Sequence, residues 1–200
     1  MNKQIVLVVG GPGKSGSSTI AKRLSEYFDI ERVYGGQFFR EVATSQGYAS
    51  IEDFLRTMNQ EEIMELDRKV DEKLRRYGLK GDVVLESKTF AAIVQKEDIS
   101  CSAKIWLNAN LETRVHRALE KEKITNPISR WIKKRQIKKD LSFRYEMDKA
   151  RYKELYNIDY DHPEKYNDLV IDNSNQTPDE TFNLIINFLE NAGINKQSKQ

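Results

Sequence analysis

The sequence predicts an α/β protein in which helices cover both faces of a mostly parallel five-stranded sheet. Two observations support this. Short, almost wholly apolar runs alternate with stretches in which apolar residues recur at helical spacing, and a glycine- and serine-rich loop joins the first run to the first helix. Strands that are apolar on both sides belong to parallel sheets with both faces covered. The alternation therefore favours a three-layer α/β/α arrangement.

The apolar runs and the helical spacing place each element in order. Strands are expected at 5–9, 31–34, 81–88, 103–107 and 168–172. Helices are expected after the first loop, at 37–47 following a Gly-Gly turn, from 51, at 59–76, at 111–121, after 127 and from 178. Ser50 and Thr177 are suitable helix caps, and Pro178 suits the first position of the last helix.

Two acidic residues lie four positions apart in the helix expected at 59–76. Asp67 and Asp71 could act as a pair, but Arg68 and Lys69 lie beside them. A charged run of this kind usually lies on a solvated helix face. We therefore expect both carboxylates to be exposed.

Composition limits the class of protein. The chain has 200 residues, with 33 Lys and Arg against 31 Asp and Glu. This suits a single domain at 1–194 followed by a flexible tail at 195–200, and the near-neutral charge implies no polyanionic partner. The single cysteine, Cys101, excludes an intrachain disulfide and fits a cytoplasmic location. No apolar run is long enough to cross a membrane.

The loop at Gly11–Thr19 has the composition of a phosphate-binding loop. Glycines let the backbone bend around an anion, and the helix that follows directs its positive end to the same point. In the pattern G-x-x-x-x-G-K-[ST], Gly11 and Gly16 supply the glycines and Ser18 the magnesium-binding hydroxyl, but Ser17 occupies the lysine position. The nearest cation is Lys14, which is a candidate substitute. A flexible turn without a ligand is the alternative.

Three loops are expected to meet at one edge of the sheet. Ligands of parallel sheets bind at the carboxyl ends of the strands. Those ends carry residues 11–18, 35–40 and 86–88. We therefore predict one cleft there.

Several segments in this order resemble a known family, the compact archaeal-type cytidylate kinases, which are P-loop nucleoside monophosphate kinases. The resemblance covers about residues 4 to 190 and rests on residues 10–12, 35–40, 84–86, 105–107, 151–161, 166–173 and 177–179. It implies a P-loop NTPase fold with a helical lid, and ATP-dependent phosphorylation of CMP or dCMP.

The resemblance also implies roles for single residues at the nucleotide end. Ser18 would bind Mg²⁺, and Glu86 would orient the water molecules around the metal. The ATP phosphates would be held by the loop residues Gly11, Pro12, Gly13, Lys14, Ser15, Gly16, Ser17, Ser18 and Thr19.

At the acceptor end, the resemblance implies a helical acceptor-binding region at about 36–78 and a lid at about 122–156. Arg40, with Gly36 and Lys88, would hold the monophosphate of the acceptor, because cations and above all guanidinium groups bind phosphate oxygens. The lid would bring Arg144 and Arg151 to the transferring phosphoryl group, with Asp148 holding them in place.

Three positions depart from the family pattern: Ser17 replaces the loop lysine, Ser87-Lys88 replaces Gly-Arg, and Gln37 replaces an acidic residue. A relative that binds nucleotide with little catalysis, or a kinase of another small acceptor, therefore stays an alternative. Arg40 could instead pair with a surface carboxylate. The basic residues after Pro127 could bind nucleic acid, but a solvated helix face is the simpler interpretation. We expect a monomer.

Overall fold

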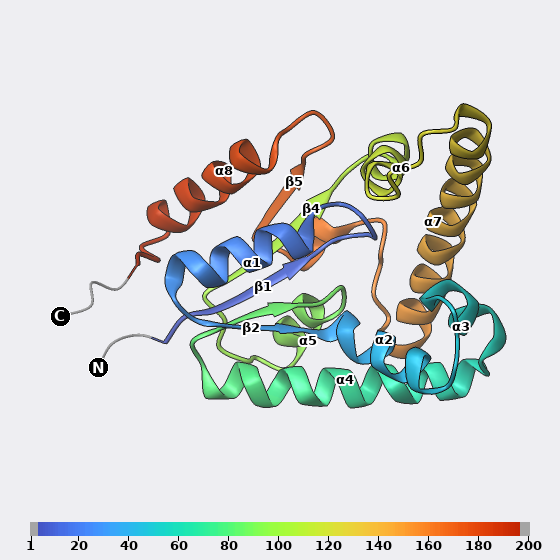
Figure 1. Ribbon diagram of the computed structural model, residues 1–200. Helices are drawn as coiled ribbons and strands as arrows, with labels where there is room; N and C mark the ends of the chain where they lie inside the picture. Colours follow the sequence, from blue (N-terminus) through green and yellow to red (C-terminus); the bar gives the residue numbers. More distant parts are fainter. Residues whose placement is uncertain (1–3, 197–200) are drawn as a thin grey trace.

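The computed structural model describes residues 4–196 and contains one sheet of five parallel strands in the order β2-β3-β1-β4-β5 (Figure 1). The strands are β1 (Val6–Gly10), β2 (Glu31–Tyr34), β3 (Val83–Glu86), β4 (Ala103–Asn108) and β5 (Leu169–Asp172). All five lie where the sequence predicts them. Every strand pairing is parallel, which confirms the predicted α/β class.

Each face of the sheet has its own apolar core. Alternate residues of β1 point to opposite faces. Leu7 and Val9 pack with α1 (Ser17–Phe28) and α8 (Pro178–Asn191), whereas Val6 and Val8 pack with α4 (Gln60–Lys80) and α5 (Phe90–Lys96). Both faces are therefore covered, and this is why β1 contains no polar residue.

Side-chain caps define where five of the helices begin. Ser50 caps α3 (Ile51–Thr57), and Thr177 forms a reciprocal capping box with Glu180 at the start of α8, as expected. Asn residues cap α4, α6 (Leu111–Glu120) and α7 (Pro127–Tyr156). The helix α2 (Gly35–Ser45) begins two residues earlier than predicted, because the two glycines form its first turn instead of a separate turn.

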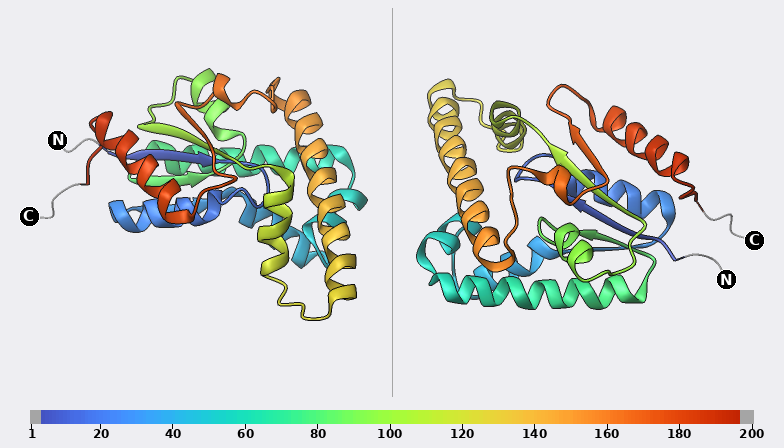
Figure 2. Two further views of the ribbon diagram at one scale, coloured as in Figure 1. Left: turned by 90° about the horizontal axis from the view of Figure 1, so that it is seen from above. Right: turned by 180° about the vertical axis from the view of Figure 1, so that it is seen from behind.

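The helix α7 stands on the side of the molecule away from both termini, and it runs beside α6 (Figures 1 and 2). Ile137 and Leu141 are buried against α6, but Trp131 and Ile132 are 58% and 57% exposed. Four basic residues of α7 form ion pairs with acidic residues of α6 or of the turn after it: Arg130, Lys133, Lys134 and Lys138. These pairs support the solvated-face interpretation over nucleic-acid binding.

The predicted tail at 195–200 lies mostly outside the described residues, and the extent of the domain stays a prediction. Among residues 4–196, no helix combines the length and the apolar composition that a membrane span requires.

Candidate functional site

The loop that follows β1 needs its glycines. A Cβ on Gly11 would lie 2.4 Å from the carbonyl oxygen of Leu107, and Gly16 has a φ of 103°. Gly16 is also the N-cap of α1, and no side chain caps this helix, in contrast to α3, α4, α6, α7 and α8. The first N–H groups of α1 are therefore available to an anion.

Side chains from distant segments hold the carbonyl groups of this loop. Arg117 donates to the Ser15 oxygen at 3.0 Å, and the side-chain amide of Asn173 donates to the same oxygen at 2.9 Å. Arg114 donates to the Gly13 oxygen at 3.4 Å. The sequence analysis did not identify these three residues. The available signal was two arginines, three positions apart, on the helix that follows the carboxyl end of β4.

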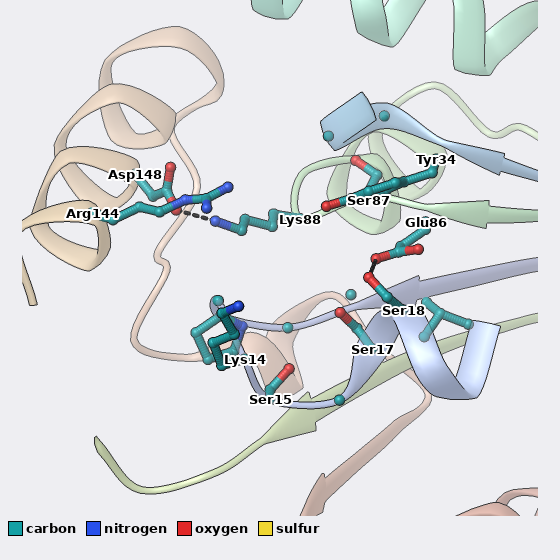
Figure 3. A pocket seen from close by; sticks show the side chains of 18 of the residues that line it. Lys14, Ser15, Ser17, Ser18, Tyr34, Glu86, Ser87, Lys88, Arg144 and Asp148 are labelled. Atoms are coloured by element: carbon teal, nitrogen blue, oxygen red, sulfur yellow. Dashed lines mark hydrogen bonds and ion pairs between the residues drawn. The ribbon is translucent and has the colours of Figure 1, made fainter. Parts of the chain in front are cut away.

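Lys14 is the cation of the loop, and its backbone is in the left-handed region with a φ of 68°. Its amine faces the space between the loop and the side chains of Lys88 and Arg144 (Figure 3). Burial lowers the pKa of Lys14, and the positive charges of Lys121 and Arg40 lower it further. Several cations thus surround one space, and an anion there would relieve their repulsion.

The metal-binding residues suggested by the sequence lie in contact. The Ser18 hydroxyl donates a hydrogen bond to the Glu86 carboxylate, although they are 68 positions apart. Glu86 is 4% exposed and also pairs with Arg32 (Figure 3 shows the serine and the carboxylate). A hydroxyl and a carboxylate beside an uncapped helix start are hard oxygen donors, which suit Mg²⁺ with nucleotide phosphates. The residues present therefore fit this metal.

The residues that the resemblance assigns to a lid gather around Asp148, which is 2% exposed. Its carboxylate accepts a hydrogen bond from Lys88 and forms an ion pair with Arg151 Nη2 at 3.1 Å. Burial raises the pKa of Asp148, but the charges of Lys88, Arg151 and Arg144 outweigh this and lower it. Burial lowers the pKa of Lys88 to about 8, and the Asp148 charge only partly opposes that effect.

Arg144 lies beside this group and joins it to α3. Its Nη1 is 3.6 Å from Glu52 Oε1 on α3. A second bridge between the same helices is shorter, because Arg56 Nη2 is 2.7 Å from Asp140 Oδ1. The helix α7 is thus tied to α3, and Arg144 faces the space above Lys14 (Figure 3).

Arg40 is exposed on α2, and its guanidinium lies 5.0 Å from the centre of the Tyr34 ring. No carboxylate among the described residues forms an ion pair with it, so the surface ion pair considered for Arg40 is wrong. Gly36 is needed beside the same ring, since a Cβ there would lie 2.7 Å from it. Arg40 and Gly36 both line the cavity described below.

The expectation that Asp67 and Asp71 lie on a solvated face is wrong. Both are 5% exposed, because the inner face of α4 packs beneath α2, α5 and α7. Asp67 Oδ2 forms an ion pair with Arg151 Nε at 2.5 Å, and Asp71 accepts hydrogen bonds from Thr89 and Tyr156. Burial raises the pKa of Asp67 to about 7 and that of Asp71 to about 6.

A single cavity of about 640 Å³ joins these groups. One end is lined by the phosphate-binding loop and Arg117, and the other by α2, α3 and α4 with Asp67 and Asp71. An uncapped helix start, a hydroxyl–carboxylate pair and several cations on a parallel sheet define a P-loop phosphotransferase site.

Comparisons with known proteins agree with this class. A family model described as an AAA domain matches residues 9–138. The cytidylate kinase of Methanopyrus kandleri is 34% identical over 188 residues, covering 90% of this chain and 91% of that protein. The cytidylate kinase of Methanocaldococcus jannaschii is 32% identical over 187 residues, covering 94% of this chain and 98% of that protein. The chain belongs to the cytidylate kinase family of P-loop nucleoside monophosphate kinases.

A solved structure of shikimate kinase from Bacteroides thetaiotaomicron superimposes with a TM-score of 0.57 at 12% identity, covering 94% of this chain and 99% of that one. This likeness concerns the fold. It agrees with the predicted three-layer P-loop architecture.

Proposed function

We propose that this protein transfers the γ-phosphoryl group of ATP to CMP or dCMP. The observation that supports this most directly is the single cavity in which the phosphate-binding loop, the Ser18–Glu86 pair and the cations of the lid meet. Membership of the cytidylate kinase family supports the acceptor class.

The loop Gly11–Thr19 would hold the ATP phosphates through its backbone N–H groups. Ser18 and Glu86 would hold Mg²⁺, which would supply charge neutralisation on the β- and γ-phosphates when bound. Lys14 would replace the missing loop lysine, because its amine faces the cavity and Ser17 has no charge.

Transfer needs two phosphates in line and their charge neutralised. We propose that Arg40, with Gly36 beside it, and Lys88 bind the acceptor phosphate and that Arg144 reaches the transferring phosphoryl group. Arg151 is bound to Asp67 and Asp148, so we propose that it acts on the phosphoryl group together with Asp148. An oxygen of the acceptor phosphate displaces ADP from the γ-phosphorus, and the closed lid excludes water as a rival acceptor.

A coupled assay of ADP release tests the proposal. We expect turnover with CMP and dCMP well above the rate with ATP alone. Tight nucleotide binding without turnover would identify a binding relative instead. Turnover with another phosphorylated or hydroxylated acceptor, but not with CMP, would identify a different kinase.

We further propose that the enzyme serves pyrimidine nucleotide metabolism in the cytoplasm and acts as a monomer. Cys101 is the one cysteine of the chain, and burial raises the pKa of its thiol to about 11, which makes it a poor partner for disulfide exchange. Size-exclusion chromatography with light scattering would test the oligomeric state.

A further inference from the structure

Both oxygens of the Glu86 carboxylate accept hydrogen bonds from other side chains. The Ser18 hydroxyl donates to Oε1 (Figure 3), and the Arg32 guanidinium donates to Oε2, with Nε at 3.2 Å and Nη2 also in contact. The side chain of Glu86 is 5% exposed. A buried carboxylate without a cation beside it is costly, so the charge of Arg32 compensates the buried charge of Glu86.

Arg32 reaches this carboxylate from the edge of the sheet. It lies on the edge strand β2, two residues before Tyr34, whose partner on β3 is Glu86. Its guanidinium lies 5.3 Å from the centre of the Tyr34 ring. Tyr34 and Glu86 line the cavity, whereas Arg32 is not among the described residues that line it. Arg32 therefore acts on the site through Glu86, without contacting a ligand.

This ion pair determines the charge that a metal ion would meet at Ser18 and Glu86. The pair of Arg32 and Glu86 is neutral overall, and no acidic side chain lies in the first turn of α1. The start of that helix carries a partial positive charge. A neutral pair beside a positive helix end attracts a divalent cation weakly. Nucleotide phosphates bound to the same helix end would add the missing negative charge.

We propose that Arg32 is a positioning residue that makes the binding of Mg²⁺ at Ser18 and Glu86 depend on bound nucleotide. This rests on the proposed function, in which the same two residues hold the metal. Arg32 holds the Glu86 carboxylate in place and neutralises it. The site is therefore closed to a metal ion alone and accepts Mg²⁺ together with the nucleotide phosphates.

The test measures metal affinity directly. Mn²⁺ is titrated into the protein without nucleotide and followed by electron paramagnetic resonance, and ADP is titrated in a calorimeter at a series of Mg²⁺ concentrations. We expect Arg32→Gln to bind Mn²⁺ at least about 5-fold more tightly than the wild type, because it removes a positive charge beside the carboxylate. The Mg²⁺ concentration that gives half of the gain in ADP affinity should fall by a similar factor. Arg32→Lys keeps the charge and should resemble the wild type.

Arg23→Gln is the matched control. Arg23, on α1, forms an ion pair with Asp179 at 2.7 Å and lies 4.3 Å from the centre of the Phe182 ring. Its side chain is 30% exposed, against 25% for Arg32. Arg23→Gln should leave both metal measurements unchanged. In the Glu86→Gln background, Arg32→Gln should no longer change them, because Arg32 acts through that carboxylate.

Thermal unfolding shows whether each variant folds, and Arg32→Met is a second uncharged replacement with the same expected result. Unchanged or weaker metal binding in the folded uncharged variants overturns the proposal, because an arginine that only orients the carboxylate would favour metal binding. An equal gain in Arg23→Gln, or a gain that persists in the Glu86→Gln background, also overturns it.

The same measurements separate this proposal from the proposed function. Wild-type protein whose ADP affinity does not depend on Mg²⁺ would refute the metal site and the role of Arg32 together. Magnesium-dependent ADP binding without phosphorylation of CMP or dCMP would refute the proposed function alone, and the metal titrations would still decide the role of Arg32.

Discussion

The hydroxyl of Ser18, in the first turn of α1, donates a hydrogen bond to the carboxylate of Glu86 at the end of β3. The serine and the glutamate therefore lie together before any ligand arrives. Their oxygens lie beside the helix start that would bind the phosphates, which is where Mg²⁺ is needed. This contact leads to the first prediction.

Glu86→Gln should reduce kcat at least about 100-fold, because the amide is neutral and binds a hydrated divalent cation poorly. Calorimetric titration with ADP should distinguish a loss of metal binding from a loss of the folded structure. We expect the variant to bind ADP without metal as the wild type does, but to lose most of the gain in affinity that Mg²⁺ gives. Glu26→Gln, an exposed residue of α1, is the control. Wild-type magnesium dependence in Glu86→Gln would contradict the assignment.

Lys14 allows charge and backbone conformation to be separated. Lys14→Ala should abolish transfer and leave the fold intact. Lys14→Gly should lose activity as well, but should raise the free energy of unfolding by about 1 kcal/mol, because glycine adopts a φ of 68° without strain. A coupled ADP-release assay and chemical denaturation measure the two effects.

The double variant Lys14→Gly with Ser17→Lys is the matched control, since it moves the ammonium group to the usual position of the pattern. We expect it to recover a large part of the activity lost in Lys14→Gly. Full activity in Lys14→Ala would show that Lys14 does not replace the missing lysine.

The sequence was sufficient for the elements whose signals are local. Apolar runs located the five strands, and the caps at Ser50 and Thr177 set the starts of α3 and α8. The loops that carry Ser18 and Glu86 were expected to meet at one edge of the sheet, because parallel strands bring their carboxyl ends together; the roles of the two residues toward Mg²⁺ came from the loop pattern and the family resemblance. These predictions needed no knowledge of side-chain packing.

Asp67 and Arg117 show what the sequence could not supply. Charged neighbours made Asp67 look solvated, because a helix 21 residues long displays charge on most of its surface. Only the packing of α7 and α2 over α4 buries it. Arg117 contacts a loop that lies 102 positions earlier, and its local sequence offers only the spacing of two arginines on one helix as a signal, which does not identify the loop that they contact.

Lys88→Arg should change the pH dependence of the reaction. Burial lowers the pKa of Lys88 to about 8, so the free enzyme loses this positive charge as the pH rises through 8. The wild-type kcat/KM for CMP should therefore fall above about pH 8, whereas arginine keeps its charge. We expect the fall to disappear in Lys88→Arg between pH 8 and pH 9.5. A fall at the same pH in the variant would assign the titration to another group, for which Lys14 is the nearest candidate.

Asp67 should also affect how stability changes with pH. Burial raises its pKa from 3.8 to about 7, so between these values the folded state binds a proton that the unfolded state has released. The stability that this proton contributes is complete below about pH 4 and is lost as the pH rises through 7. Asparagine does not titrate. The free energy of unfolding of the wild type, relative to Asp67→Asn, should therefore fall between pH 5 and pH 8 by on the order of 2 kcal/mol. Urea denaturation at several pH values measures it. As a control, the difference in free energy of unfolding between the wild type and Asp71→Asn should level off nearer pH 6, where Asp71 titrates. If the difference between the wild type and Asp67→Asn does not vary with pH, the Asp67 carboxyl titrates normally.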